Sequence, residues 1–170
     1  PHIGGSTEEA QEIVGLRIAE QVVEYLKNGV ALNAVNMPAL SREQYRALGP
    51  YAVLAEGLGI LAANIATGHP KTVRFVYFGK LADSNTSLLR NAGVAGVLGR
   101  STPHRVNLVN AMQLAEQRGW NVAERHEIRS GRLDSIRIEL ETDKGITSAE
   151  GTVVFDKPRL TQVDGIQCEA

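Results

Sequence analysis

The stretch Ser135–Phe155, SIRIELETDKGITSAEGTVVF, decides the fold. Over Ser135–Glu141, apolar and charged side chains alternate one by one, with isoleucine or leucine at every second position. This two-residue period predicts a β-strand with one buried face and one polar face. Asp143–Gly145 then predicts a hairpin turn. Ile146–Phe155 is therefore expected to return as the neighbouring antiparallel strand.

Three further segments are expected to extend this sheet. Thr72–Leu81 carries apolar side chains on both faces, which predicts a strand in the interior of the sheet. Val122–Arg129 and Arg159–Val163 are shorter strand candidates. Together with the hairpin they predict an antiparallel or mixed sheet of about four or five strands, near the usual size.

Helical patterns precede and separate these strands. Ser41–Leu48 predicts a short helix that Gly49-Pro50 ends, and Tyr51–Thr67 predicts a strongly apolar helix. Ser87–Gly99 predicts a third helix, and a fourth is expected to end at Arg118. The order predicts an α+β fold with helices packed on one face of the sheet.

The apolar helix contains a formal G-x-G-x-x-A pattern at Gly57–Ala62. A dinucleotide site would need a strand before this pattern and an acidic residue after a second strand. Neither is present, so we interpret the glycines as positions where helices approach each other closely.

The chain begins with PHIGGST, Pro1–Thr7, followed by an amphipathic helix expected over Ser6–Lys27. Ser6 with Glu9 forms a capping-box pattern. A histidine just before a helix N-terminus can act as an acid or a base near neutral pH. His2 is thus a candidate catalytic residue; the alternative is an incidental histidine beside a capped helix.

Composition excludes several classes of function. The formal net charge of −1 and the few aromatic residues argue against nucleic-acid binding. We expect no membrane segment, no signal peptide and, from the single cysteine, a reducing compartment. No metal site is expected, because the four histidines are widely separated and no CxxC spacing occurs. Because the 170 residues start at Pro1 rather than Met, we expect a piece of a longer protein.

The strongest candidate for ligand binding is an arginine-rich turn, comprising Arg125, His126, Arg129 and Arg132. Guanidinium groups bind carboxylate or phosphate in a bidentate manner, and a turn adds backbone N–H donors. The alternative is a solvated hairpin end whose arginines pair with neighbouring glutamates and bind nothing.

A second candidate anion site is Ser101–Arg105, at an expected helix start. Ordinary helix capping explains its Thr-Pro step equally well. Asn107 and Asn110 could support either site, or satisfy backbone groups at the helix start.

Several runs resemble the long form of D-3-phosphoglycerate dehydrogenase. They are PHIGGSTEEAQEIVGLRIAEQVVEYLKNG at 1–29, AVN at 34–36, PY at 50–51 with LAEGLG at 54–59, and VNLVNA at 106–111 with LA at 114–115 and RG at 118–119. By this resemblance, residues 1–36 are the last helix and tail of the catalytic part. Residues 37–170 are the intervening, or allosteric substrate-binding, domain that precedes an ACT domain.

The resemblance implies that His2 is the acid/base catalyst and that Gly4 and Gly5 border the nicotinamide of NAD. The nucleotide-binding loop, the catalytic arginine and the catalytic carboxylate would lie upstream, outside this chain. The resemblance also implies a cytoplasmic enzyme of L-serine biosynthesis that oxidises 3-phosphoglycerate, assembled as a homo-oligomer, in the parent a tetramer. For this chain it implies a regulatory role with a small anionic ligand such as phosphate or 3-phosphoglycerate. The alternative is a purely structural module that builds the oligomer and anchors the ACT domain.

Overall fold

The computed structural model describes residues 5, 7–28, 40–99, 106–127 and 133–168. The chain divides into two compact units, Pro1–Tyr45 and Arg46–Ala170. The predicted boundary between residues 36 and 37 lies outside the described residues and stays a prediction. In chain order, the elements of the described parts are α1 (Glu8–Asn28), α2 (Arg42–Ile65), β1 (Pro70–Phe78), η1 (Gly79–Asp83), α3 (Ser87–Gly99), α4 (Ala111–Gln117), β2 (Asn121–Glu127), β3 (Ser135–Thr142), β4 (Ile146–Val154), β5 (Lys157–Val163) and β6 (Ile166–Gln167).

The first unit contains α1. Its N-cap is Thr7, one residue later than predicted: the backbone N–H of Ala10 donates to Thr7 Oγ1 at 3.2 Å. Ser6, the predicted cap, lies outside the described residues. The apolar side chains of α1 are about half exposed, as at Val14 (55%) and Ile18 (54%).

α2 corrects the prediction that Gly49-Pro50 ends a short helix, because one continuous helix runs through Pro50. A proline ring collides with the Cβ of the residue before it, and Gly49 has no Cβ, which removes that obstacle. The predicted cap at the start is confirmed: Ser41 N–H donates to Gln44 Oε1 at 2.9 Å, and Gln44 N–H donates to Ser41 Oγ at 3.1 Å. These reciprocal bonds satisfy two backbone donors that the helix start would otherwise leave unpaired.

In the described part of the second unit, six strands form one mixed sheet in the order β2-β1-β3-β4-β5-β6. β1 and β2 are parallel and all other neighbours are antiparallel. The predicted α+β fold with a mixed sheet is confirmed, with a strand count slightly above the predicted four or five. The additional strand β6 has two residues.

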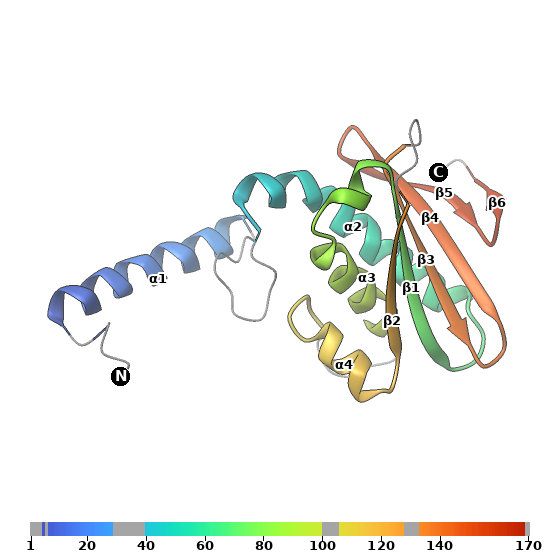
Figure 1. Cartoon of the computed structure of the whole chain (residues 1–170), viewed down its shortest axis with the longest axis horizontal. Helices are drawn as coiled ribbons and strands as arrows, with labels where there is room; N and C mark the ends of the chain where they lie inside the picture. Colours follow the sequence, from blue (N-terminus) through green and yellow to red (C-terminus); the bar gives the residue numbers. More distant parts are fainter. Residues whose placement is uncertain (1–4, 6, 29–39, 100–105, 128–132, 169–170) are drawn as a thin grey trace. The chain divides into compact units, whose positions relative to one another are not determined.

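The α+β arrangement follows from the parallel pair. Two parallel strands need a crossover connection, and here η1, α3 and α4 lie between β1 and β2 in the chain. α2 and α3 cover one face of the sheet (Figure 1). The other face carries the outward residues of the strands, including the charged side chains of β3.

The core lies between the sheet and these helices. The alternation predicted for β3 is confirmed, with Ile136, Ile138 and Leu140 fully buried. The prediction that β1 is an interior strand is also confirmed, since it lies between β2 and β3. Phe75 of β1 is buried under α3, where a Cβ added to Gly93 would overlap its ring.

The glycine pattern of α2 serves packing, as predicted, at Gly59. A Cβ on Gly59 would overlap the carbonyl oxygen of Gly93, and a Cβ on Gly96 of α3 would overlap that of Glu56. α2 and α3 therefore meet backbone to backbone. Gly57 does not share this role, because a Cβ there would meet nothing within 4 Å.

Within the described residues, one helical segment, Glu43–Ile65 of α2, is long enough and apolar enough to cross a membrane. Length and composition alone are weak evidence for such a span. A helix that packs in a protein core has the same features, and Leu54 and Leu58 on α2 are core residues.

Candidate functional site

The predicted catalytic and cofactor-binding residues lie at the start of the chain. His2 and Gly4 fall outside the described residues, so their roles stay predictions. Gly5 is exposed, and a Cβ added there would meet nothing within 4 Å. Its role beside the cofactor also stays a prediction.

Two residues of the predicted arginine-rich site, Arg125 and His126, are in β2. Arg129 and Arg132 lie outside the described residues. Because successive residues of a strand point to opposite faces, Arg125 and His126 do not share a face of the sheet. The structure thus separates the two described members of this cluster.

His126 lies on the face that the helices cover. Its ring centroid is 5.2 Å from that of Tyr77, its cross-strand neighbour on β1. Its Nδ1 is 2.8 Å from the carbonyl oxygen of Ala82 in η1, a hydrogen-bond distance when Nδ1 carries the proton. These contacts hold the end of β2 against η1.

Arg125 lies on the open face of the sheet, the face opposite α2 and α3. There it has a counterpart that sequence reasoning described only as an outward residue: Arg137 of β3. Both are cross-strand neighbours of Val76, one on each side of it. Arg125 pairs with Glu127 at 3.0 Å, and its side chain is 65% exposed. The pairing of this arginine with a neighbouring glutamate was foreseen as the alternative to ligand binding.

Arg137 is held more firmly than Arg125. Its Nε and Nη2 donate to Glu150 Oε2 at 2.9 and 2.7 Å, and its guanidinium lies over the ring of Phe78 at 5.4 Å. Ser135 donates to the other oxygen of Glu150 at 3.0 Å. The Glu150 side chain is only 8% exposed, and both of its carboxylate oxygens accept hydrogen bonds.

A polar hollow of about 170 Å³ lies beside this pair. Its lining residues are Arg137, Glu150, Thr161, Gln162 and Gln167. A β-bulge in the pairing of β4 with β5 places Thr161 and Gln162 together opposite Glu150. The hollow thus offers a guanidinium, a carboxylate and two carboxamides to a small polar ligand. The sequence signal for it was limited to the outward position of Arg137 on β3.

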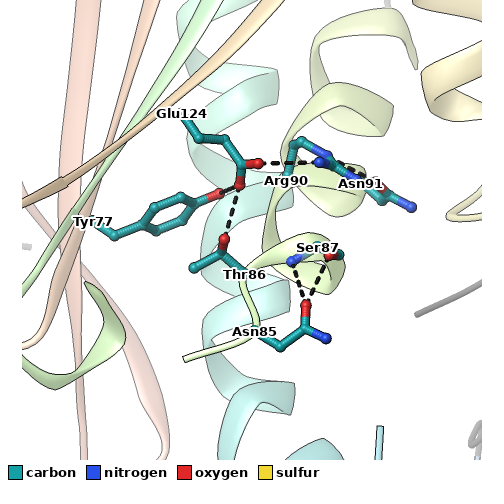
Figure 2. A network of polar contacts seen from close by, with 7 residues as sticks. All are labelled: Tyr77, Asn85, Thr86, Ser87, Arg90, Asn91 and Glu124. Atoms are coloured by element: carbon teal, nitrogen blue, oxygen red, sulfur yellow. Dashed lines mark hydrogen bonds and ion pairs between the residues drawn. The ribbon is translucent and has the colours of Figure 1, made fainter. Parts of the chain in front are cut away.

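A second polar cluster lies on the helix-covered face, around Glu124 of β2 (Figure 2). Its carboxylate accepts hydrogen bonds from Tyr77 Oη at 3.1 Å, Thr86 Oγ1 at 2.9 Å and Arg90 Nη1 at 3.0 Å. The sequence placed Glu124 beside the arginine-rich turn as a local partner. The structure instead directs it to β1 and to the start of α3.

The Glu124 cluster changes the acid–base behaviour of Tyr77. Burial raises the pKa of this phenol far above its usual value near 10, and the nearby carboxylate of Glu124 raises it further. Tyr77 therefore remains a neutral donor across the physiological range. It links β1 to β2 through Glu124, and it does not release its proton near neutral pH.

The same cluster continues along α3 (Figure 2). Asn91 Nδ2 donates to the carbonyl oxygen of Leu108 at 3.0 Å, which ties α3 to the segment before α4. At the start of α3, Asn85 Oδ1 accepts from the N–H of Ser87 at 3.2 Å and from its hydroxyl at 2.8 Å. The Asn91 bond thus joins two segments of the fold, whereas the Asn85 bonds are local to the turn before α3.

The predicted second anion site, Ser101–Arg105, lies outside the described residues. The nearby Asn107 and Asn110 satisfy backbone groups before α4, which was one of the two predicted roles. Asn107 Oδ1 accepts from the N–H groups of Val109 and Asn110 at 2.9 and 3.0 Å. Asn110 Oδ1 in turn accepts from the N–H of Asn107 at 2.8 Å. Within the described ranges, no group of three or more histidine, cysteine, aspartate or glutamate residues is placed to hold a metal ion.

Comparison with known proteins places these observations in a family. Residues 47–164 match the model of the D-3-phosphoglycerate dehydrogenase intervening domain. D-3-phosphoglycerate dehydrogenase of Methanocaldococcus jannaschii is 37% identical over 98% of this chain, which spans 32% of that relative. The chloroplastic D-3-phosphoglycerate dehydrogenase 2 of Arabidopsis thaliana is 36% identical over 96% of the chain and 29% of the relative. The Bacillus subtilis enzyme is 27% identical over 99% of the chain and 33% of the relative.

The chain thus spans about a third of the length of these relatives. The match to the family model covers most of the second compact unit, including strands β1 to β5, the Glu124 cluster and the contact of α2 with α3. The chain belongs to the D-3-phosphoglycerate dehydrogenase family and contains its intervening domain.

Proposed function

We propose that this chain is the anion-binding, regulatory and assembly part of an NAD-dependent D-3-phosphoglycerate dehydrogenase. The whole enzyme would oxidise 3-phosphoglycerate to 3-phosphohydroxypyruvate, the first step of L-serine biosynthesis, in the cytoplasm and as a homo-oligomer, by resemblance a tetramer. The membership of the chain in this family supports the parent activity. The position of Arg125 and Arg137 on one open face of the sheet is the observation that carries the anion-binding role.

In the whole enzyme, His2 would take the proton of the substrate hydroxyl, and Gly4 and Gly5 would lie along the cofactor. NAD, when bound, supplies the acceptor for the hydride that leaves the substrate carbon. The other parts of the catalytic site belong to the upstream portion of the relatives. This chain alone is therefore expected to give no NADH-linked turnover.

Anion binding on the open face requires an exchange of partners. The Arg125 side chain is 65% exposed and its partner Glu127 lies at 3.0 Å. Arg125 is the exposed member of this pair, whereas the Glu127 side chain is only 14% exposed. An incoming phosphate or carboxylate would therefore take over donors of Arg125 from the solvent side, at the cost of weakening the ion pair of a largely buried carboxylate. Arg137, fixed by Glu150 and Phe78, would remain in place as the second positive charge.

Titration calorimetry with phosphate, 3-phosphoglycerate and serine tests this proposal. We expect heat with a phosphate-bearing ligand, and loss of that heat in Arg125→Ala, Arg129→Ala and Arg132→Ala. Arg17→Ala, at an exposed position of α1, is the matched control and should bind normally. No heat with any of the three ligands would overturn the anion-binding role.

A second candidate is a structural module that binds no ligand, holding the ACT domain and building the oligomer. A specific observation favours it: Arg74, Arg90, Arg125 and Arg137, all on or beside the sheet, each pair with a glutamate. Under this second candidate the calorimetry stays silent, while self-association of the chain persists.

A further inference from the structure

The turn between β4 and β5 carries an aromatic residue in an unfavourable place. Phe155 has φ 50° and Asp156 has φ 58°, so both central residues of this two-residue turn are left-handed. Turns of this type favour asparagine and glycine, because a bulky side chain is strained there. Phe155 is also 93% exposed. Neither the turn nor the core of this chain therefore accounts for a phenylalanine at this position.

An apolar groove of about 190 Å³ lies between α2 and β5. Val53, Gly57 and Leu61 line it from the helix, and Pro158, Arg159 and Leu160 line it from the strand. A Cβ on Gly57 would meet nothing within 4 Å, so the groove is open beside this residue. An apolar cavity of about 150 Å³ is large enough for a benzene ring. The groove therefore has room for a phenylalanine ring.

The exposed ring and the groove belong to the same hairpin. Phe155 at the turn is followed, three positions later, by Pro158 at the groove wall. A two-fold axis between them lets two copies exchange rings reciprocally, which gives a closed pair and no chain of copies. Charges of opposite sign flank both surfaces: exposed Asp156 and Lys157 follow the ring, while exposed Glu56 lies beside Gly57 on α2 and exposed Arg159 lines the groove. Across the axis, lysine of one copy would meet glutamate of the other.

We propose that a second copy of this chain docks on this surface, with Phe155 of each copy inserted in the α2–β5 groove of the other. This inference names the surface that would serve the assembly role proposed above, and it rests on that part of the proposed function. It is independent of anion binding on the open face of the sheet. The exposed side chains Val53 (61%) and Ile60 (47%) of α2 would then lie at the same interface.

Sedimentation velocity of the chain over three decades of concentration, without added anion, tests the inference. We expect a reversible dimer. Phe155→Asn should raise the dimer Kd at least tenfold while raising the Tm of the monomer, because asparagine tolerates the left-handed turn. Simple misfolding would also weaken association but would lower the Tm, so a raised Kd together with a raised Tm is diagnostic.

Three further variants complete the test. Gly57→Leu should fill the groove and weaken association with an unchanged circular dichroism spectrum. Lys157→Glu should weaken it, and adding Glu56→Lys should restore it. Ile166→Asn, at another exposed apolar position of the sheet, should associate normally. If the chain dimerises but Phe155→Asn and Gly57→Leu leave the Kd unchanged, this surface is wrong while the assembly role stands. If the chain is monomeric at every concentration, both fail, and calorimetric anion binding is unaffected by either result.

Discussion

Gly59 of α2 packs backbone to backbone against Gly93 of α3, so that a Cβ on Gly59 would overlap the carbonyl oxygen of Gly93. The reciprocal contact joins Gly96 of α3 to the carbonyl oxygen of Glu56. Two helices can approach this closely only where neither carries a side chain at the crossing. Gly59 of α2, together with Gly93 and Gly96 of α3, therefore allows the close approach of the two helices that cover the sheet.

The first prediction concerns this crossing. Gly59→Ala and Gly96→Ala should each lower the free energy of unfolding by about 2 kcal/mol, because the added methyl forces backbone apart. Gly57→Ala, two residues away in the same helix, should instead stabilise by about 0.5–1 kcal/mol, since its Cβ is free and alanine is the better helix residue. Denaturant titration at a dilution where the chain is monomeric measures all three. If Gly57→Ala lowered the free energy of unfolding as much as Gly59→Ala, the proposed backbone contact at Gly59 would be wrong.

The second prediction concerns the carboxylate of Glu124. Glu124→Gln should destabilise by about 1–3 kcal/mol, because it weakens three hydrogen bonds to a charged acceptor at once. Tyr77→Phe removes one of these bonds and should cost about 1 kcal/mol. In the double variant the two losses should not add, because both act on one network. Additive losses in a double-mutant cycle would show that the bonds are independent.

Much of the sheet was predictable because its signals are local. The alternation in Ser135–Glu141 marks β3 and its buried face without reference to any other segment. The extent predicted for the third helix, Ser87–Gly99, is that of α3. Such signals arise where one side of an element is buried and the other is solvated.

The features that escaped prediction depend on residues far apart in the chain. Glu124 meets Tyr77 only because β2 pairs in parallel with β1, across a crossover that contains α3 and α4. The residues next to Glu124 in the sequence do not indicate that its carboxylate contacts Tyr77 and not the adjacent Arg125. Arg137 and Glu150 likewise meet only through the register of β3 with β4. The continuity of α2 through Pro50 was missed because the proline signal was given more weight than the absence of a Cβ at Gly49.

The third prediction concerns alkaline pH. The pKa of Tyr77 is raised in the folded chain, so above pH ~10 the unfolded chain loses this proton while the folded chain keeps it. The contribution is therefore complete below pH ~10 and is lost as the pH rises further. Burial also raises the pKa of Tyr45 and Tyr51, so Tyr77→Phe should make the decline shallower without abolishing it. Urea midpoints on either side of this pH, compared between wild type and Tyr77→Phe, measure the effect. An identical decline in both proteins would contradict the prediction.

The fourth prediction concerns the turn between α2 and β1. The carboxylate Oδ1 of Asp143, in the β3–β4 hairpin, accepts a hydrogen bond from the backbone N–H of His69 at 2.7 Å. This bond is the main cause of the lowered pKa of Asp143; desolvation opposes it in part, and the charge of His69 adds to it. A lowered folded pKa means that the stabilisation is present above the unfolded pKa of about 3.9 and is lost as the pH falls through the folded value. Asp143→Ala should therefore destabilise the chain at neutral pH, and its unfolding free energy should fall less steeply on acidification. Ile146→Ala, at an exposed and uncharged position just after the same hairpin turn, is the control and should keep the steep acid dependence. Urea midpoints from pH 7 down to about pH 3 decide the matter: equal slopes in Asp143→Ala and the wild type would show that this carboxylate does not link the turn to the hairpin.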